Sequence, residues 1–523
     1  MMARNCMRGK IAITPRRSVA LFALLSIAMV IVSYILVIVL ATACVYLPYR
    51  GLQSTGHPEA QLAILFLGGI LVAGAMLWSL VPRREKFEPP GALLDRGWHP
   101  KLFAELDDIA ASLNEPLPGE VYLIGQVNAF VADRGGILGF GSRRIMAVGL
   151  PLLSVLNISE FRGVVAHEFG HYYSGDTSIG PWVYKTQAAM IRTFQSIGSL
   201  QGIRVGAVQL MYGLISFVLK QYFVGFLRVV NFVSRKKEHR ADELACLVAG
   251  SAACMRGMRK VHGGGMAWMP YWNSEVLPVL DRGCRPDIAD GFARFLAAPE
   301  IAAQVMQGIE KEIAEGKTNP YDTHPPLRDR IAAIERLSIA PAEENSEPAL
   351  SLLGAPEAIE LQFLKFINPK LEENSLRHVG WDDVRDTITI PAWKSALAGY
   401  GAFLQGITAE ALPEVIPKLP DIGRQIRDPQ GMLLTPQQRT ERAGRLLASA
   451  LALTLLDKGW QLETQPGQFY FHRGSEKINV FALMDELIAG KLSNEIWIAR
   501  CNEFGINGSP LDCGVKTPAG PAQ

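Results

Sequence analysis

Apolar residues concentrate in two blocks near the N-terminus, whereas the rest of the chain mixes apolar and polar positions. Residues 18–47 and 62–81 contain no charged side chain, and each block is long enough to cross a bilayer as a helix. A cleaved signal peptide is the alternative for the first block, but its apolar core would exceed the usual length of roughly 7–15 residues. We therefore predict a membrane anchor over residues 1–90, with two transmembrane helices in the lipid bilayer.

Basic residues flank the two apolar blocks unevenly. Those before the first block are Arg4, Arg8, Lys10, Arg16 and Arg17, and those after the second are Arg83, Arg84 and Lys86. The loop between the blocks has Arg50 as its only Lys or Arg. Because basic flanks tend to remain in the cytoplasm, we expect a multi-pass cell-membrane protein with two spans and with the chain after residue 82 on the cytoplasmic side.

The next region, residues 91–337, has the pattern of an α+β domain. Three short runs with strand-like composition lie at residues 121–124, 128–133 and 144–148. They predict a small sheet, because glycine-rich turns separate them. Ser159 is a suitable N-cap for a helix that continues to Tyr172, and a second long helix is predicted over residues 231–248.

A stretch rich in Pro, Ala, Glu and Ser at residues 338–356 is interpreted as a linker. Residues 357–523 then predict a C-terminal domain of helices and strands, whose role the residues do not indicate. Its clearest elements are a helix, two strands and a second helix, at residues 440–457, 460–463, 468–472 and 479–489. The predicted fold class is thus α+β: two transmembrane helices, a mainly helical middle domain with a small sheet, and a C-terminal α+β region.

Charge and cysteine content exclude some classes of function. The chain has 52 basic and 50 acidic residues, a net charge of +2, and this balance predicts no nucleic-acid partner. Its seven cysteines are scattered and form no CxxC pair, which argues against a disulfide scaffold or a thiolate zinc site. Free thiols in a reducing compartment agree with the cytoplasmic orientation.

The segment His167-Glu168-Phe169-Gly170-His171 has the spacing of a metal site on a helix. The two histidines are four residues apart and share one helix face, so both imidazoles can bind one Zn²⁺ ion. Glu168 lies about 100° around the helix from His167, where it can take a proton from metal-bound water. An ordinary polar turn is the alternative, but the apolar neighbours indicate a buried helix in which these side chains need partners.

A catalytic zinc ion needs a third protein ligand and one position for water. Glu238 is the best candidate, and Asp242 lies one turn further on the same helix face, where it can accept a hydrogen bond from the free nitrogen of a liganding imidazole. A solvated, charged helix start is the alternative for this segment. His239 is a rival ligand, but it faces away from Asp242. Asp176, five residues after His171, is interpreted as structural.

In the order of these motifs the chain resembles the integral-membrane zinc endopeptidases that include the CAAX prenyl protease and the HtpX-type heat-shock proteases. The resemblance covers about residues 100–335 and the preceding anchor. Four features match in order: Asn128-Ala129-Phe130, His167-Glu168-x-x-His171, Glu238-x-x-x-Asp242, and His324-Pro325 followed by Arg330. The resemblance implies a zincin-type peptidase domain with one zinc ion and a polypeptide substrate.

The resemblance also implies roles for individual residues. Glu238 would be the third zinc ligand, and His324 and Arg330 would stabilise the oxyanion of the tetrahedral intermediate, where cationic donors are most useful. The alternatives are a helix-entry residue for His324 and an exposed helix charge for Arg330. The strand with Asn128-Ala129-Phe130 would be a sheet edge to which extended substrate adds a strand, an ordinary sheet strand being the alternative.

One apolar segment departs from that family. HtpX-type members have two further spans between the two metal-binding helices, and the prenyl protease encloses its site in a chamber of many helices. Here residues 205–232 carry Lys220 and Arg228 and are too short for two spans of about 20 residues each. We interpret them as a core helix or an interfacial amphipathic segment. With two spans, a closed intramembrane chamber and prenylated substrates are not expected.

We therefore predict a membrane-anchored zinc metalloendopeptidase in which Glu168 is the general base. Membrane protein quality control is implied only by the resemblance to HtpX-type members, and selective processing of one partner protein is an alternative. A catalytically silent, metal-binding membrane scaffold whose C-terminal domain binds a partner is the rival from another class. The presence of Glu168 argues against it, because a structural zinc site needs no general base. A transporter would need more spans, and the sequence indicates no oligomeric state.

Overall fold

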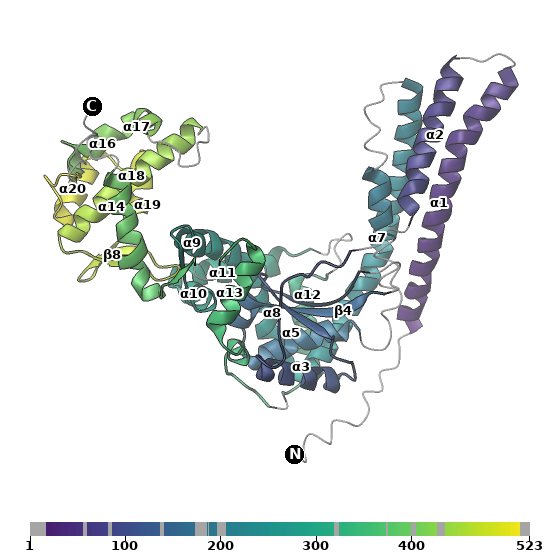
Figure 1. Cartoon of the computed structure of the whole chain (residues 1–523), viewed down its shortest axis with the longest axis horizontal. Helices are drawn as coiled ribbons and strands as arrows, with labels where there is room; N and C mark the ends of the chain where they lie inside the picture. Colours follow the sequence, from purple (N-terminus) through teal and green to yellow (C-terminus); the bar gives the residue numbers. More distant parts are fainter. Residues whose placement is uncertain are drawn as a thin grey trace. The chain divides into compact units, whose positions relative to one another are not determined.

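The computed structural model divides the chain into two compact units (Figure 1). Unit 1 comprises Met1–Met266 and Val305–Ile367, and unit 2 comprises Ala267–Gln304 and Asn368–Gln523. The structure describes residues 17–55, 60–81, 86–135, 141–172, 186, 188–195, 206–317, 324–341, 343–372, 375–398, 404–425 and 435–512. Each unit is described by itself.

Three helices of unit 1 are long and apolar enough to cross a membrane: α1 (Arg17–Thr55), α2 (Ala60–Leu80) and α7 (Gly206–Ala249). The first two contain the two predicted spans. They pack on each other and on the first half of α7 (Figure 1). Their shared core is formed by Val37, Ala41, Cys44, Val72, Ala73, Met76, Ile215 and Leu219.

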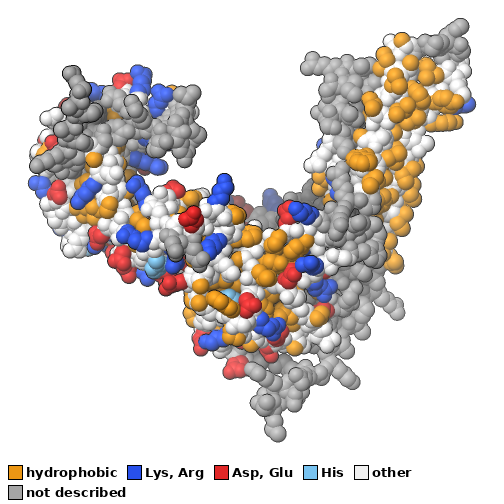
Figure 2. All heavy atoms as spheres, in the orientation of Figure 1, with side chains coloured by type: hydrophobic (Ala, Val, Ile, Leu, Met, Phe, Trp, Pro, Cys, Tyr) orange, Lys and Arg blue, Asp and Glu red, His pale blue; other side chains and the backbone are white. Residues whose placement is uncertain are grey.

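The outward faces of these helices are also apolar. Ile35, Leu67 and Leu71 are each more than half exposed, and apolar side chains cover the visible face of α1 and α2 (Figure 2). Such a continuous exposed apolar surface is typical of side chains that contact lipid. On the inner side, a Cβ at Gly69 would lie 2.0 Å from the carbonyl oxygen of Cys44, so the absence of a side chain lets α1 and α2 approach closely.

The interpretation of residues 205–232 as a core or interfacial helix stays a prediction, and the structure adds a membrane span as a candidate. From residue 206 they form the first half of α7 and pack on α1 and α2, which makes α7 a third candidate span. Residues 188–195 are helical and join this bundle. The hydroxyls of Ser79 and Thr193 are 2.6 Å apart, and the rings of Phe194 and Phe223 are 5.7 Å apart. The second half of α7 contains the predicted helix at residues 231–248, so one helix joins the apolar bundle to the metal-binding segment.

Unit 1 contains a four-stranded sheet in the order β1-β2-β4-β3. Its strands are β1 (Ala92–Leu93), β2 (Glu120–Ile124), β3 (Ala129–Arg134) and β4 (Arg143–Gly149). β2 is parallel to β4, and β3 is antiparallel to β4, with Ala129 opposite Val148. The three predicted strands are confirmed, and β3 is an edge strand of this sheet.

α4 (Leu150–Val155), α5 (Ile158–Gly170) and α13 (Pro356–Ile367) contact this sheet, and α3 (Pro100–Ser112) packs on α5. Later in the chain come α8 (Ser251–Tyr271) and α11 (Pro299–Glu315), both of which continue into unit 2, and α12 (Leu327–Leu337), which packs on α7. The predicted N-cap of α5 is wrong. Asn157 caps the helix by accepting a hydrogen bond from the Glu160 backbone N–H (2.8 Å), while the Glu160 carboxylate accepts one from the Asn157 N–H (3.0 Å). This capping box was visible in the sequence as Asn-x-x-Glu. Ser159 instead accepts a hydrogen bond from the backbone N–H of Asn345.

Residues 343–356, which make up most of the predicted linker, pack within unit 1. Backbone N–H groups of Ile158 and Ala349 donate to the carbonyls of Glu347 and Leu156, both at 2.9 Å. The N–H of Gly354 donates to the imidazole of His99. Because these hydrogen bonds and the buried side chain of Ala349 fix the segment, it is part of the packed unit and does not separate two domains.

Unit 2 combines the segment 267–304, which the sequence assigns to the peptidase domain, with the C-terminal region. Its helices are α9 (Leu277–Leu280), α10 (Ile288–Ala297), α14 (Ile390–Ala398), α16 (Leu412–Val415), α17 (Leu419–Gln425), α18 (Pro436–Asp457), α19 (Val480–Ile488) and α20 (Asn494–Phe504). Its strands are β5 (Cys284–Arg285), β6 (Arg377–His378), β7 (Gln461–Glu463), β8 (Tyr470–Arg473) and β9 (Glu476–Ile478). The predicted order of helix, two strands and helix is confirmed in α18, β7, β8 and α19. The cysteines in the described part of the chain are free and buried, as expected.

Candidate metal centre

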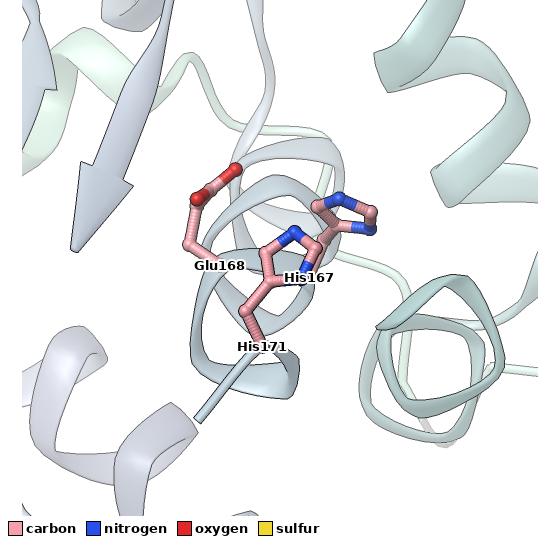
Figure 3. A group of neighbouring side chains, drawn as sticks. All are labelled: His167, Glu168 and His171. Atoms are coloured by element: carbon pink, nitrogen blue, oxygen red, sulfur yellow. The ribbon is translucent and has the colours of Figure 1, made fainter. Parts of the chain in front are cut away.

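The two histidines of the motif lie in the last turn of α5 and at its C-cap (Figure 3). Their ring centroids are 4.7 Å apart in an edge-to-face arrangement. The opposite face of α5 is held by fully buried Phe161, Val165 and Phe169, which fixes the direction of the polar face. The helix therefore presents both imidazoles to the same point, as the spacing of four residues predicts.

A glycine inside the motif brings the second metal-binding helix close. A Cβ at Gly170 would lie 3.0 Å from the Cα of Ala241 on α7, so a larger residue would push the two helices apart. Because Ala241 is less than one turn from Glu238, this contact places the Glu238 carboxylate beside the histidines. Gly170 is thus the local reason that residues far apart in the sequence meet.

The Glu238 carboxylate has the spacing of a metal ligand. Its Oε2 is 3.4 Å from Nε2 of His167, and its Oε1 is 3.6 Å from Nε2 of His171. Two ligands bound at about 2.0–2.1 Å in tetrahedral geometry lie roughly 3.3 Å apart. Oε2 is buried and accepts no hydrogen bond from the described residues, and a buried carboxylate oxygen without one is costly unless a cation binds it. The donor set therefore fits a zinc ion.

Glu168 is a rival for the third ligand position. Its carboxylate lies in one group with the nitrogens of His167 and His171, all within 4.8 Å of one another. Glu238 is preferred because its two oxygens lie 3.4 and 3.6 Å from Nε2 of His167 and His171, and because Glu168 leaves α5 on a different side from His167 (Figure 3). Glu168 then remains beside the site with a carboxylate that can exchange a proton.

Asp242 and Arg330 lie behind His167, the first candidate metal ligand. Oδ1 of Asp242 is 3.0 Å from Nδ1 of His167, which leaves Nε2 of the imidazole on the side of Glu238. The Arg330 guanidinium holds Asp242 with two hydrogen bonds, from Nη2 to Oδ1 (2.6 Å) and from Nε to Oδ2 (3.0 Å). The Asp242 and Arg330 side chains are 4% and 13% exposed, so the pair is an interior one and Arg330 is not an exposed helix charge.

His324 lies at the open side of the site. Its Nδ1 is 3.1 Å from Oε1 of Glu238, and its side chain is 61% exposed. Arg330 Nη1 is 3.7 Å from Oε2 of the same carboxylate. The structure thus brings His324 and Arg330 to the site in which the sequence places them. Asp176 lies outside the described residues.

Burial and neighbouring charges set the protonation of the site. Burial raises the pKa of Glu168 to about 7. Burial lowers the pKa of His171 to about 4, and the charge of His167 acts in the same direction. Burial also lowers the pKa of His167, but the Asp242 and Glu238 carboxylates beside its imidazole outweigh it and raise this pKa to about 9. The Asp242 and Glu238 carboxylates thus stabilise positive charge between them, as they would stabilise a bound cation.

A cavity of about 510 Å³ opens from the site. Its lining includes His167, Glu168, Asp242, His324, Arg330 and also Asn128. The wall away from the metal-binding residues comes from α7, α8 and α11 and includes Ala245, Cys254, Met258, Val261, His262 and Glu312. His262 and Glu312 form an ion pair of 3.0 Å. Sequence reasoning missed this wall, because α8 and α11 carry no short motif that marks it.

The predicted substrate strand is an edge strand of its sheet, but its three predicted residues differ in burial and in whether they line the cavity. Asn128 lines the cavity, and its side-chain oxygen accepts a hydrogen bond from the Ala129 N–H (2.9 Å). Ala129 is buried and Phe130 is half-buried, and neither lines the cavity. The rival ligand His239 does not line it either.

Residues 99–338 match peptidase family M48. Among similar proteins, the protease HtpX homolog of Prosthecochloris aestuarii is 25% identical over 314 residues, which cover 55% of this chain and 89% of the relative. The protease HtpX homolog of Campylobacter concisus is 24% identical over 241 residues, covering 45% and 74%. That of Aeropyrum pernix is 26% identical over 267 residues, covering 43% and 77%. Residues 99–338 are thus a peptidase family M48 region, and with its apolar helices the chain is a membrane-anchored metalloprotease similar to the HtpX-type proteases.

Proposed function

We propose that the chain is a zinc endopeptidase whose single ion is held by His167, His171 and Glu238, with Glu168 as the general base. The observation that carries this proposal is the placement of the two Glu238 oxygens 3.4 and 3.6 Å from the two histidine Nε2 atoms, beside the Glu168 carboxylate. A bound zinc ion supplies a lowered pKa for water and polarisation of the peptide carbonyl. Every further step falls to side chains of the chain itself.

Glu168 moves the proton. Its carboxylate takes a proton from the attacking water as the oxygen–carbon bond forms, and returns it to the amine as the carbon–nitrogen bond breaks. His324 and Arg330 stand on the Glu238 side of the site and donate toward the carbonyl oxygen, where negative charge develops. Asp242 keeps the Nδ1 proton on His167, so that Nε2 has a lone pair for the metal.

The substrate in this proposal is an extended polypeptide segment. It pairs with the edge of β3, because β3 is the last strand of its sheet and Asn128 joins the strand to the cavity. The active site lies at the cytoplasmic membrane surface, since the helix that carries Glu238 continues into the apolar bundle of α1 and α2. Exposed or misfolded segments of membrane proteins are the substrate class that this position favours, and several relatives are named HtpX-type proteases.

The test uses the full chain purified in detergent, loaded with zinc and offered unstructured quenched-fluorescent peptides. Glu168→Gln is expected to lower kcat by about 10²-fold or more while the zinc content stays unchanged. Glu243→Gln is the matched control, because Glu243 lies on α7 and pairs with Arg240 at 2.7 Å. If Glu168→Gln cleaves like the wild type, or if zinc-loaded wild type cleaves no peptide, the metal-binding scaffold becomes the better interpretation.

A further inference from the structure

The hydrogen-bonding pattern of β3 identifies which of its backbone groups face the free edge. The N–H of Gly149 donates to the carbonyl of Asn128 (2.9 Å), so these two residues form a hydrogen-bonded pair across β3 and β4. In an antiparallel ladder, hydrogen-bonded and non-hydrogen-bonded pairs alternate. Ala129 opposite Val148 and Val131 opposite Met146 are therefore non-hydrogen-bonded pairs. The backbone groups of Ala129 and Val131 point away from β4, toward the edge that a substrate would use, and so do those of Asp133, which lies opposite Arg144.

Two of the four edge groups of Ala129 and Val131 are already bonded. The Ala129 N–H donates to the side-chain oxygen of Asn128, and the hydroxyl of Tyr172 donates to the carbonyl of Val131 (2.8 Å). Within the described part of the chain, the carbonyl of Ala129 and the N–H of Val131 are left for another strand, and the edge groups of Asp133 lie beyond the Tyr172 hydroxyl. The usable edge is therefore shorter than the six residues of β3.

Tyr172 is held in this position from several sides. Its backbone N–H donates to the carbonyl of Phe169 (2.9 Å), which continues α5 directly behind His171. The Arg144 guanidinium lies over its ring, 4.6 Å from the centroid, and Arg144 is itself paired with Asp133 at 3.5 Å. The hydroxyl that caps the Val131 carbonyl thus belongs to a fixed side chain next to a metal-binding residue.

We infer that Tyr172 sets the length of the substrate strand: its hydroxyl occupies the Val131 carbonyl, so substrate backbone pairs with β3 through the Ala129 carbonyl and the Val131 N–H and is stopped before it reaches Asp133. This inference rests on the proposed endopeptidase function. A short pairing window requires only a few extended residues next to the scissile bond. The substrates it favours are short exposed segments, such as loops and frayed ends, and long extended strands gain little from their extra length.

The experiment is a backbone N-methyl scan of one cleaved peptide. Each N-methyl group removes a single N–H donor and leaves the side chains unchanged. In wild type, methylation of the residue opposite the Val131 carbonyl is expected to leave kcat/KM unchanged, because Tyr172 already occupies that acceptor. In Tyr172→Phe the ring remains on Arg144 but the carbonyl becomes available, so the same methyl group is expected to lower kcat/KM by roughly 2- to 10-fold.

Tyr122→Phe is the matched control, since the Tyr122 hydroxyl bonds the Glu120 carboxylate on β2 (2.8 Å) and not the edge. It is expected to give the wild-type scan. The inference is overturned if wild type and Tyr172→Phe respond equally to every N-methyl group. It is also overturned if N-methylation of the residue opposite the Val131 carbonyl already lowers kcat/KM of the wild-type enzyme. Both results leave peptide cleavage intact, so they differ from a failure of the proposed function, in which wild type cleaves nothing and the inference falls with it.

Discussion

The Asp242 carboxylate lies 3.0 Å from Nδ1 of His167 and so fixes which imidazole nitrogen faces Glu238. Asp242→Asn keeps the shape of the side chain but removes the acceptor charge. We expect zinc affinity to fall by roughly 10- to 100-fold, the usual cost of losing such a partner. Chelator competition measures the change, with Glu243→Gln on the same helix as the control. An unchanged zinc affinity would show that the imidazole needs no carboxylate partner.

Arg330 and Arg328 lie two residues apart on α12 but differ in surroundings. Arg330 is 13% exposed and bonded twice to Asp242, whereas Arg328 is 52% exposed and pairs only at the surface with Asp329. Removing one partner of a buried pair costs about 3–5 kcal/mol, so Arg330→Ala should strongly lower the free energy of unfolding. Arg328→Ala should change it by less than about 0.5 kcal/mol.

Denaturant unfolding of the two variants, side by side in detergent, checks this expectation. The comparison also addresses the alternative that Arg330 is an ordinary helix charge. Equal stabilities for the two alanine variants would support that alternative. A loss of activity in Arg330→Lys with little loss of stability would instead point to the donor geometry of the guanidinium.

Glu238 and its neighbour His239 allow a direct test of the third ligand. Glu238→Ala is expected to weaken zinc retention at least tenfold, because even more distant partners of a metal site have effects on that scale. His239→Ala is expected to retain zinc like the wild type, since His239 does not line the cavity. Metal analysis after equal dialysis gives both values. If His239→Ala loses zinc and Glu238→Ala retains it, His239 is the third ligand and Glu238 is not.

Local pattern was enough to predict much of the site. His167 and His171 follow from helix periodicity, and β2, β3 and β4 follow from short apolar runs between glycines. The meeting of α5 and α7 also depends on Gly170 and Ala241, a contact between helices that periodicity within either helix does not contain. The cavity wall around Met258 and Glu312 was missed for the same reason.

Two other differences arise from long-range packing. Residues 267–304 belong with the C-terminal region because, among other contacts, Cys284 pairs with Arg377, a link between distant strands of two residues each. Hydrophobic pattern is local and does not report such pairing. The first half of α7 was not interpreted as a span because residues 205–232 carry Lys220 and Arg228 and are too short for two spans of about 20 residues each. Long cationic side chains can nevertheless extend to the membrane surface.

The third candidate span gives a final prediction, based on two exposed leucines of α7. Leu214 lies in the apolar half and is 66% exposed, and Leu247 lies beyond the metal-binding residues and is 39% exposed. If the first half of α7 contacts lipid, Leu214→Cys in liposomes should resist a water-soluble maleimide, whereas Leu247→Cys should react. The unmodified chain gives the background, and its described cysteines are buried. Labelling of both positions at the same rate would place the first half of α7 in water and return the number of spans to two.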